Sequence, residues 1–382
     1  MRSLLIVFGW LCCTVTFAQD AEPVWPTHGW QTSTPEEQGM DSAELAKLVD
    51  FGKTRKLDSL LLVRHGRIVL DVYYDPFPAD FPHVFHSATK SITGSLIGIA
   101  LNDGLLDGLD RPVLDFFRDR TIENVDERKK AMTVQHLLDM TSGIQWQEPL
   151  SGPYTSSFEM SRSPDWIKFV LDRPMANAPG DTFDYNTGNS QLLSAIITKL
   201  TGMSARDYAK ARLFGSLGIS TVYWPYDPQR HATGGFGLVM LPRDMAKIGY
   251  LYLRDGEWEG KRLLPPGWIE KVSRATVDMK QPNAPSLRYA NSFWAFPDKK
   301  VFMAVGFQCQ LLMVFPELDI VAVTTARDFC PFGKVAEDIS GAVKSKTALP
   351  ANASGAALLA TAIRNVSADK AAEAGSTNQR LR

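Results

Sequence analysis

The chain has 382 residues, enough for one large domain or two small ones. Hydrophobic residues make up 45% and charged residues 22%, the composition of an ordinary globular protein that can bury a sizeable core. The formal net charge of −1 gives no basis for nucleic acid or an anionic membrane surface as a partner.

The N-terminus has the pattern of a signal peptide spanning residues 1–18. Arg2 provides a positive start, and the stretch from Leu4 to Phe17 is apolar but short for a bilayer span. Thr16 and Ala18 supply small residues for a signal peptidase, so cleavage is expected after Ala18. The mature protein would then be periplasmic or secreted, without a stable membrane span. A retained membrane anchor is the alternative.

The first third of the mature chain alternates between helix and strand patterns. Leu45, Leu48 and Val49 share one side of a predicted helix from Asp41 to Thr54. Runs rich in Leu, Val, Ile and Tyr predict two strands joined by a tight turn, Ser59–Arg64 and Ile68–Tyr74. A second apolar helix is predicted from Ser87 to about Asn102.

The remainder is mainly helical until strands return near the end. Helices are predicted over Thr133–Met140, Ser190–Leu200 and Pro242–Arg254. Four short β-rich runs follow: Ser292–Phe296, Val301–Val305, Gln310–Phe315 and Ile320–Thr325. A closing helix is predicted over Phe332–Lys344. Beyond Leu349 the chain is Ala-rich, polar and without aromatic residues, so a disordered tail is expected over 350–382.

These elements predict an α+β domain over residues 19–349. Strands joined by tight turns must be antiparallel, so the sheet is expected to be mainly antiparallel and flanked by helices. Its strands come from about 40–130 and 285–345, and the segment of about 130–285 between them forms a helical lobe.

One serine and one lysine have the spacing of a nucleophile and its base. Ser87-Ala88-Thr89-Lys90 fits S-x-x-K at the start of an apolar helix, where residues three apart share a face. A hydroxyl needs a nearby base, and burial can lower the pKa of a lysine enough for that role. The alternative is a helix cap at Ser87 with Lys90 on a solvated face. A second match, Ser367 to Lys370, falls in the expected tail.

The segment Phe85 to Gly94 resembles the active-site segment of the serine β-lactamase and penicillin-binding-protein superfamily, most closely its 6-aminohexanoate-dimer hydrolase branch. Further similarities follow in order over roughly residues 40 to 345: Thr133–Leu138, Thr141–Gly143, Pro179-Gly180, Phe183–Tyr185, Asp244–Gly249 and Gly306–Gln310. The resemblance implies a β-lactamase/transpeptidase-like fold and an acylated serine, here Ser87.

The resemblance also implies a catalytic tyrosine. Relatives carry Y-x-N or Y-x-S, whereas Tyr185-Asn186-Thr187 has threonine in third place. Literal matches begin at Tyr154 and Tyr289. Tyr289 lies too near the last strands, and Tyr154 lacks the preceding Pro-Gly and the following Leu-rich helix. Order and flanking residues favour Tyr185, which would exchange a proton with Lys90 as general base and then acid.

The strand that lines the site in relatives departs from their pattern. Its usual Lys-Thr-Gly or His-x-Gly corresponds to Ala304-Val305-Gly306, so the cation that helps to hold a substrate carboxylate is missing. This argues against β-lactamase and D-alanyl peptidase activity. Gly306 would let the strand approach the substrate. The resemblance implies that the backbone N–H of Phe307 is the second donor of the oxyanion hole, beside the N–H of Ser87.

The sequence therefore predicts a serine hydrolase that cleaves a small-molecule or peptide-like ester or amide. No cofactor is required, and no H-E-x-x-H or clustered metal ligands are present. The absence of G-x-S-x-G leaves an α/β-hydrolase site unsupported. Two alternatives remain: a penicillin-binding D-alanyl peptidase or β-lactamase, and a non-catalytic cell-envelope binding protein with the same fold.

Two cysteines remain after the expected cleavage, Cys309 and Cys330. They flank a predicted hairpin, and an oxidising compartment would permit a disulfide between them. Two buried thiols are an equal alternative.

Overall fold

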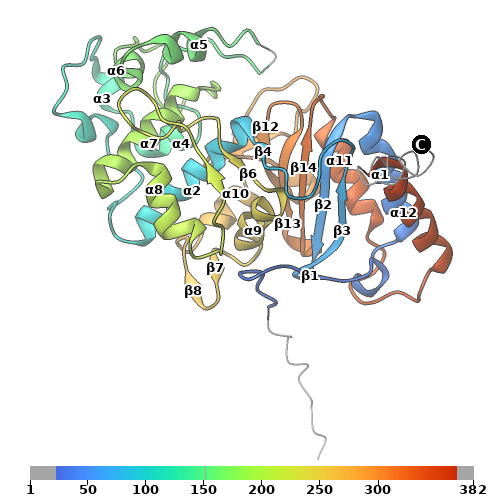
Figure 1. The fold of residues 1–382 in the computed structure, drawn as a ribbon. Helices are drawn as coiled ribbons and strands as arrows, with labels where there is room; N and C mark the ends of the chain where they lie inside the picture. The colour runs from blue at the N-terminus through green and yellow to red at the C-terminus, as the bar shows by residue number, and fades with distance from the viewer. Residues whose placement is uncertain (1–22, 151, 368–382) are drawn as a thin grey trace, which may run out of the picture.

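A sheet of nine strands runs through the part of the chain that the computed structural model describes, residues 23–150 and 152–367 (Figure 1). The expected signal peptide lies outside these residues. In spatial order the strands are β1 (Gln31–Thr32), β3 (Arg67–Tyr73), β2 (Leu57–Arg64), β14 (Ile320–Ala326), β13 (Gln310–Phe315), β12 (Val301–Gly306), β11 (Phe293–Phe296), β10 (Arg288–Ala290) and β9 (Val277–Asp278). Neighbouring strands are antiparallel except β1 and β3. The predicted mainly antiparallel sheet is confirmed, although β1 and β9 extend it beyond the expected segments.

The central strands are buried on both faces, and their side chains divide between two hydrophobic cores. On β2, Leu61 and Val63 belong to one core, whereas Leu60 and Leu62 belong to the other. This division follows from the two-residue period of a strand, which directs successive side chains to opposite faces.

Helices cover both faces of the sheet. One face is covered by α1 (Ser42–Thr54), α11 (Phe332–Ala342) and α12 (Ala353–Val366), and the other by α2 (Thr89–Asn102), α9 (Pro242–Leu253) and α10 (Trp268–Ser273), as Figure 1 shows. Asp41 caps α1 by accepting a hydrogen bond from the N–H of Ala43 at 2.8 Å. The predicted helices and strands around this sheet therefore form, with ends shifted by a few residues.

Helix α12 corrects the expectation of disorder from residue 350. Its apolar residues Leu359, Ala362 and Val366 are spaced for one face and are buried in the core that α1 also contacts. Asn352 caps its start by accepting from the N–H of Gly355 at 2.9 Å. The prediction of disorder was based on the composition of the segment, which does not reveal the three- and four-residue spacing of its apolar residues. Residues 368–382 lie outside the described part, and with them the lysine of the second S-x-x-K match.

A helical lobe stands beside the sheet (Figure 1), but it is smaller than the predicted segment of about 130–285, because α9 and α10 pack on the sheet instead. It contains α3 (Glu127–Lys130), α4 (Val134–Leu138), α5 (Thr155–Arg162), α6 (Trp166–Leu171), α7 (Thr187–Thr201) and α8 (Ala205–Ala209). Two small sheets complete the fold: β4 (His83–Val84), β6 (Val239–Met240) and β5 (Val222–Tyr223), and β7 (Glu257–Trp258) with β8 (Lys261–Arg262). Helices α2 and α7 pack against each other and bring the lobe to the sheet.

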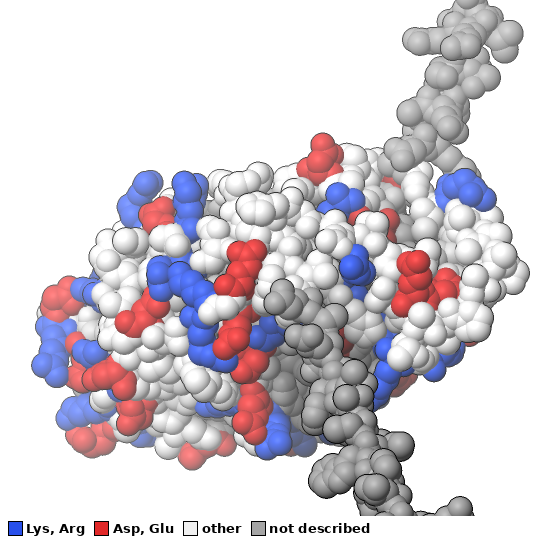
Figure 2. Space-filling model, turned by 90° about the horizontal axis from the view of Figure 1, so that it is seen from below, with Lys and Arg blue, Asp and Glu red and all other residues white. Residues whose placement is uncertain are grey.

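Acidic and basic side chains are interspersed on the face seen in Figure 2. Opposite charges also pair across the described residues, as Lys168 does with Asp172 at 2.6 Å. Over residues 23–150 and 152–367, no helix combines the length and apolar character needed to span a bilayer.

Candidate active site

Ser87 lies in a tight turn that leads into α2. Residues His86–Ala88 form a single 3₁₀ turn, and the α-helix begins at Thr89, two residues later than predicted. Lys90 follows in the first helical turn with only 2% of its surface exposed. The alternative of a solvated Lys90 is therefore wrong.

The Lys90 ammonium group has three neighbours within hydrogen-bonding reach. Its Nζ lies 3.4 Å from Ser87 Oγ, 2.9 Å from Thr187 Oγ1 and 2.9 Å from the carbonyl oxygen of Gly235. Burial lowers the pKa of Lys90 to about 8, although the nearby Glu148 carboxylate opposes this change. A lysine with this pKa is partly neutral near physiological pH and can accept a proton.

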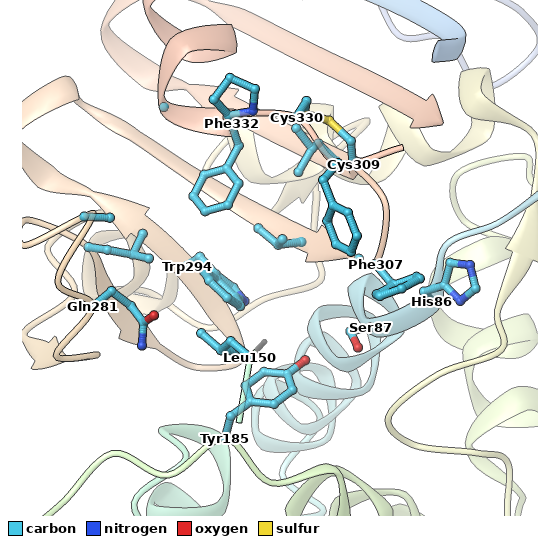
Figure 3. Close-up of a pocket in the computed structure, with 18 of the residues that line it drawn as sticks. His86, Ser87, Leu150, Tyr185, Gln281, Trp294, Phe307, Cys309, Cys330 and Phe332 are labelled. Carbon is cyan, nitrogen blue, oxygen red and sulfur yellow. A yellow bond between two sulfur atoms is a disulfide. The ribbon is translucent and has the colours of Figure 1, made fainter. Parts of the chain in front are cut away.

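Tyr185 reaches the same point from the start of α7. Asn186 caps that helix by accepting from the N–H of Asn189 at 3.1 Å, which fixes the residue before it. Figure 3 shows the Tyr185 hydroxyl directed toward Ser87. Lys90 Nζ lies 4.7 Å from the centre of its ring. Burial and the charge of Glu148 raise the pKa of Tyr185, and the nearby Ser87 side chain opposes the rise.

The two other tyrosines considered from the sequence are placed differently. Tyr154 lines the same pocket, but its hydroxyl donates to the carbonyl oxygen of Leu150 at 3.2 Å. Tyr289 is fully buried on β10, with its ring 6.3 Å from that of Trp294. Tyr185 is therefore the tyrosine whose hydroxyl is directed toward Ser87 (Figure 3).

A threonine and a glutamate that the sequence did not single out complete the surroundings of Lys90. Thr187 Oγ1 donates to Glu148 Oε1 at 2.6 Å while it accepts from Lys90. Glu148 is buried and also accepts from the N–H of Thr187 at 2.8 Å and from the indole N–H of Trp146 at 2.7 Å. Thr187 is the third residue of the altered tyrosine motif. Although threonine departs from the family pattern at this position, it places a hydroxyl beside Lys90. Glu148 has no comparable signal in the sequence.

The end of β12 borders Ser87 on the opposite side. A Cβ atom on Gly306 would lie 2.2 Å from the carbonyl oxygen of Phe85, so only glycine allows the strand to approach this closely. Phe307 follows at the strand end, and its ring lies 5.9 Å from that of His86. His86 has a φ of 44°, a left-handed conformation unusual for a residue other than glycine. The backbone just before Ser87 is thus in close contact with the end of β12.

Ser87 and Tyr185 open onto a large pocket of about 1140 Å³ (Figure 3). Gly306 and Phe307 line it as well, so the serine, tyrosine and strand residues predicted from the sequence meet at one cavity. Lys90 lies beneath them, buried in the protein.

A disulfide joins Cys309 to Cys330 and forms part of the pocket wall, with the two Cα atoms 5.5 Å apart. Of the two possibilities left open by the sequence, a disulfide and two buried thiols, the structure therefore has the disulfide. The bond holds the turn after Phe307 to the segment after β14, where Phe329 packs 5.0 Å from the Phe307 ring.

The described residues include no group of three His, Cys, Asp or Glu side chains placed to bind a metal ion.

A beta-lactamase family model matches residues 46–339, so the chain belongs to the beta-lactamase family. The 6-aminohexanoate-dimer hydrolase of Paenarthrobacter ureafaciens is 25% identical over 295 residues, 70% of this chain and 71% of the relative. The family resemblance inferred from the motifs is confirmed.

Solved structures agree with this placement. A Bacillus anthracis protein provisionally described as a 6-aminohexanoate-dimer hydrolase matches with a TM-score of 0.67 and 22% identity, over 81% of this chain and 86% of its own. EstCE1, described as a hydrolase with promiscuous acyltransferase activity, matches with a TM-score of 0.64 and 16% identity, over 80% and 99%. The chain therefore has the β-lactamase/transpeptidase-like fold and is related to hydrolases.

Proposed function

We propose that the protein is a serine hydrolase that cleaves an ester or amide through an acyl-enzyme on Ser87. The observation that carries this proposal is the meeting of three groups: Lys90 Nζ lies 3.4 Å from Ser87 Oγ, and the Tyr185 hydroxyl is directed toward the same serine (Figure 3). A hydroxyl, a lysine with lowered pKa and a phenol around one pocket form an activated nucleophile.

In the proposed reaction, neutral Lys90 and Tyr185 together remove the Ser87 proton as Oγ bonds to the substrate carbonyl carbon. The carbonyl π electrons move to oxygen and form the tetrahedral oxyanion. The bond from that carbon to the leaving oxygen or nitrogen then breaks, and Tyr185 delivers the proton to the leaving alcohol or amine. Water attacks the acyl-enzyme in the same manner, which releases the acid and restores the Ser87 hydroxyl.

The backbone N–H groups of Ser87 and Phe307 are proposed to stabilise the oxyanion. The supporting observation is the contact of Gly306 with the carbonyl of Phe85, which places the end of β12 beside the turn that carries Ser87. Donors fixed by backbone geometry need no rearrangement as charge develops on the oxygen.

We also propose that the protein acts outside the cytoplasm, in the periplasm or as a secreted enzyme. The signal-peptide pattern of residues 1–18 suggests export, and the Cys309–Cys330 disulfide fits an oxidising compartment. Cell fractionation with an antibody to the protein tests this assignment.

The activity is tested with p-nitrophenyl acetate, which is small enough to need little beyond the reacting groups. Ser87→Ala is expected to lose hydrolysis, because no other group is proposed to become acylated. Ser161→Ala is a matched control, since Ser161 lines the same pocket from α5 and its hydroxyl donates to the carbonyl of Phe158 at 2.8 Å. Equal hydrolysis by Ser87→Ala and the parent would overturn the proposal.

A further inference from the structure

We infer that the substrate carries an extended apolar chain that lies in a channel leading away from Ser87. This inference rests on the proposed function and adds the class of substrate. The pocket volume of about 1140 Å³ exceeds the upper end of typical small-ligand pockets, so it has room far beyond the reacting carbonyl.

The channel runs along one face of β11 and β12. Trp294 and Phe296 lie two residues apart on β11, so both point to the same face, and both line the pocket. Trp294 pairs with Met303 and Phe296 with Val301, whereas Gly306 marks the end nearest Ser87. Five residue steps at about 3.3 Å each give a channel roughly 17 Å long.

The wall of this channel is aromatic. The Phe332 ring at the start of α11 lies 6.0 Å from the Trp294 ring and 5.9 Å from the Phe296 ring. The Trp294 ring is also 6.2 Å from that of Tyr185, so the aromatic wall begins at the tyrosine beside Ser87 (Figure 3). Leu287 and Leu311 add aliphatic surface to the lining.

Among the described residues that line the pocket, no unpaired lysine or arginine is available to a substrate carboxylate. The two lysines of its lining, Lys299 and Lys334, lie at the distant end. Lys299 pairs with Glu337 at 2.8 Å, and Lys334 pairs with Asp338. Near Ser87, burial lowers the pKa of His86, which favours its neutral form. An uncharged alkyl or arylalkyl chain therefore matches this channel better than a charged one.

The test compares esters that differ only in chain length. One series is p-nitrophenyl acetate, butyrate, octanoate and laurate, with the chain on the acyl side, and the other is acetate esters of alcohols of increasing length. Because each buried methylene can contribute up to about fourfold, kcat/KM is expected to rise roughly tenfold or more from acetate to octanoate in at least one series.

Gly333→Leu is designed to obstruct the channel without touching the nucleophile. A Cβ on Gly333 would sit 3.8 Å from the Phe296 ring, an ordinary contact, and a larger side chain would extend into the lining. This variant should lose roughly tenfold or more on the long ester and change little on acetate. Gly341→Leu is the matched control, since it lies on the same helix with open space around its Cβ.

Two results would overturn the inference: kcat/KM that does not rise with chain length in either series, or an octanoate preference that Gly333→Leu leaves unchanged. Failure of the proposed function is distinguishable, because acetate hydrolysis by the parent and its loss in Ser87→Ala do not require the channel. Calorimetry on Ser87→Ala gives a readout without turnover: methyl octanoate should bind roughly tenfold or more tightly than methyl acetate, and the added Gly333→Leu change should remove the difference.

Discussion

Replacement of Glu148 by glutamine should move the pH dependence of the reaction to lower pH. The carboxylate raises the pKa of Lys90 against the effect of burial, so its removal lowers that pKa further. Neutral Lys90 then becomes available at a lower pH, and the rising limb of the rate profile shifts with it.

The size of the shift follows from the geometry. Lys90 Nζ and Glu148 Oε1 lie 2.9 Å and 2.6 Å from the shared Thr187 Oγ1, so they are at most 5.5 Å apart. At that separation and an effective dielectric constant of about 20, two unit charges interact by roughly 3 kcal/mol. This corresponds to a fall of roughly two pH units in the midpoint of the limb.

The assay is kcat/KM for p-nitrophenyl acetate as a function of pH. The profile of the parent should rise through a midpoint near the Lys90 pKa of about 8, and that of Glu148→Gln through a lower one. Glu159→Gln on α5 is the control, because its carboxylate is half-exposed and pairs with Arg173 instead. Loss of one buried hydrogen bond should cost Glu148→Gln about 1–3 kcal/mol of unfolding free energy, which thermal melts record separately. An unchanged midpoint in the folded variant would refute the reasoning.

Three further changes have defined outcomes. Tyr185→Phe removes only the hydroxyl and should lower kcat by about 10²–10⁴ with little effect on KM or melting temperature; an unaffected kcat would exclude the phenol from proton transfer. Gly306→Ala must displace β12 from the Phe85 carbonyl and should reduce kcat on the order of 10²–10³, so kinetics like those of the parent would contradict the proposed oxyanion site. Cys309→Ser opens a link across 21 residues to Cys330 and should lower the free energy of unfolding by about 3 kcal/mol in urea titrations; a stability equal to that of the parent would contradict this estimate.

The parts of the site that lie close together in sequence could be predicted from it. Ser87 and Lys90 share a face because they are three residues apart at a helix start, and that rule needs no tertiary information. Tyr185 required the order of family motifs, since nothing in its own neighbourhood shows that it meets Ser87. The structure adds the position of the Tyr185 hydroxyl, which is directed toward Ser87 (Figure 3).

Glu148 could not be predicted because its role depends on partners from elsewhere in the fold. It follows an irregular segment without periodicity. The free-energy cost of burying its carboxylate is offset by hydrogen bonds donated by Trp146 and Thr187. Thr187 was visible only as an exception to the tyrosine motif.

Long-range packing also explains where the prediction of the fold from the sequence was wrong. Helix α12 was predicted as disordered because its segment is rich in alanine and small polar residues, yet its apolar face finds a partner in α1. The apolar helix pattern was predicted to begin at Ser87, whereas the chain makes a 3₁₀ turn there first. The central strands were predicted well, since their apolar runs and tight turns are local features.

Trapping of the acyl-enzyme tests the central claim most directly. A slowly deacylated ester of the preferred chain length is mixed with the protein, which is then quenched in acid, and intact-mass and peptide mass spectrometry follow. The proposed chemistry predicts one acyl group per chain, on the peptide that contains Ser87, and none on the Ser87→Ala variant. An adduct on another residue, or turnover of the ester without any acylated Ser87, would contradict it.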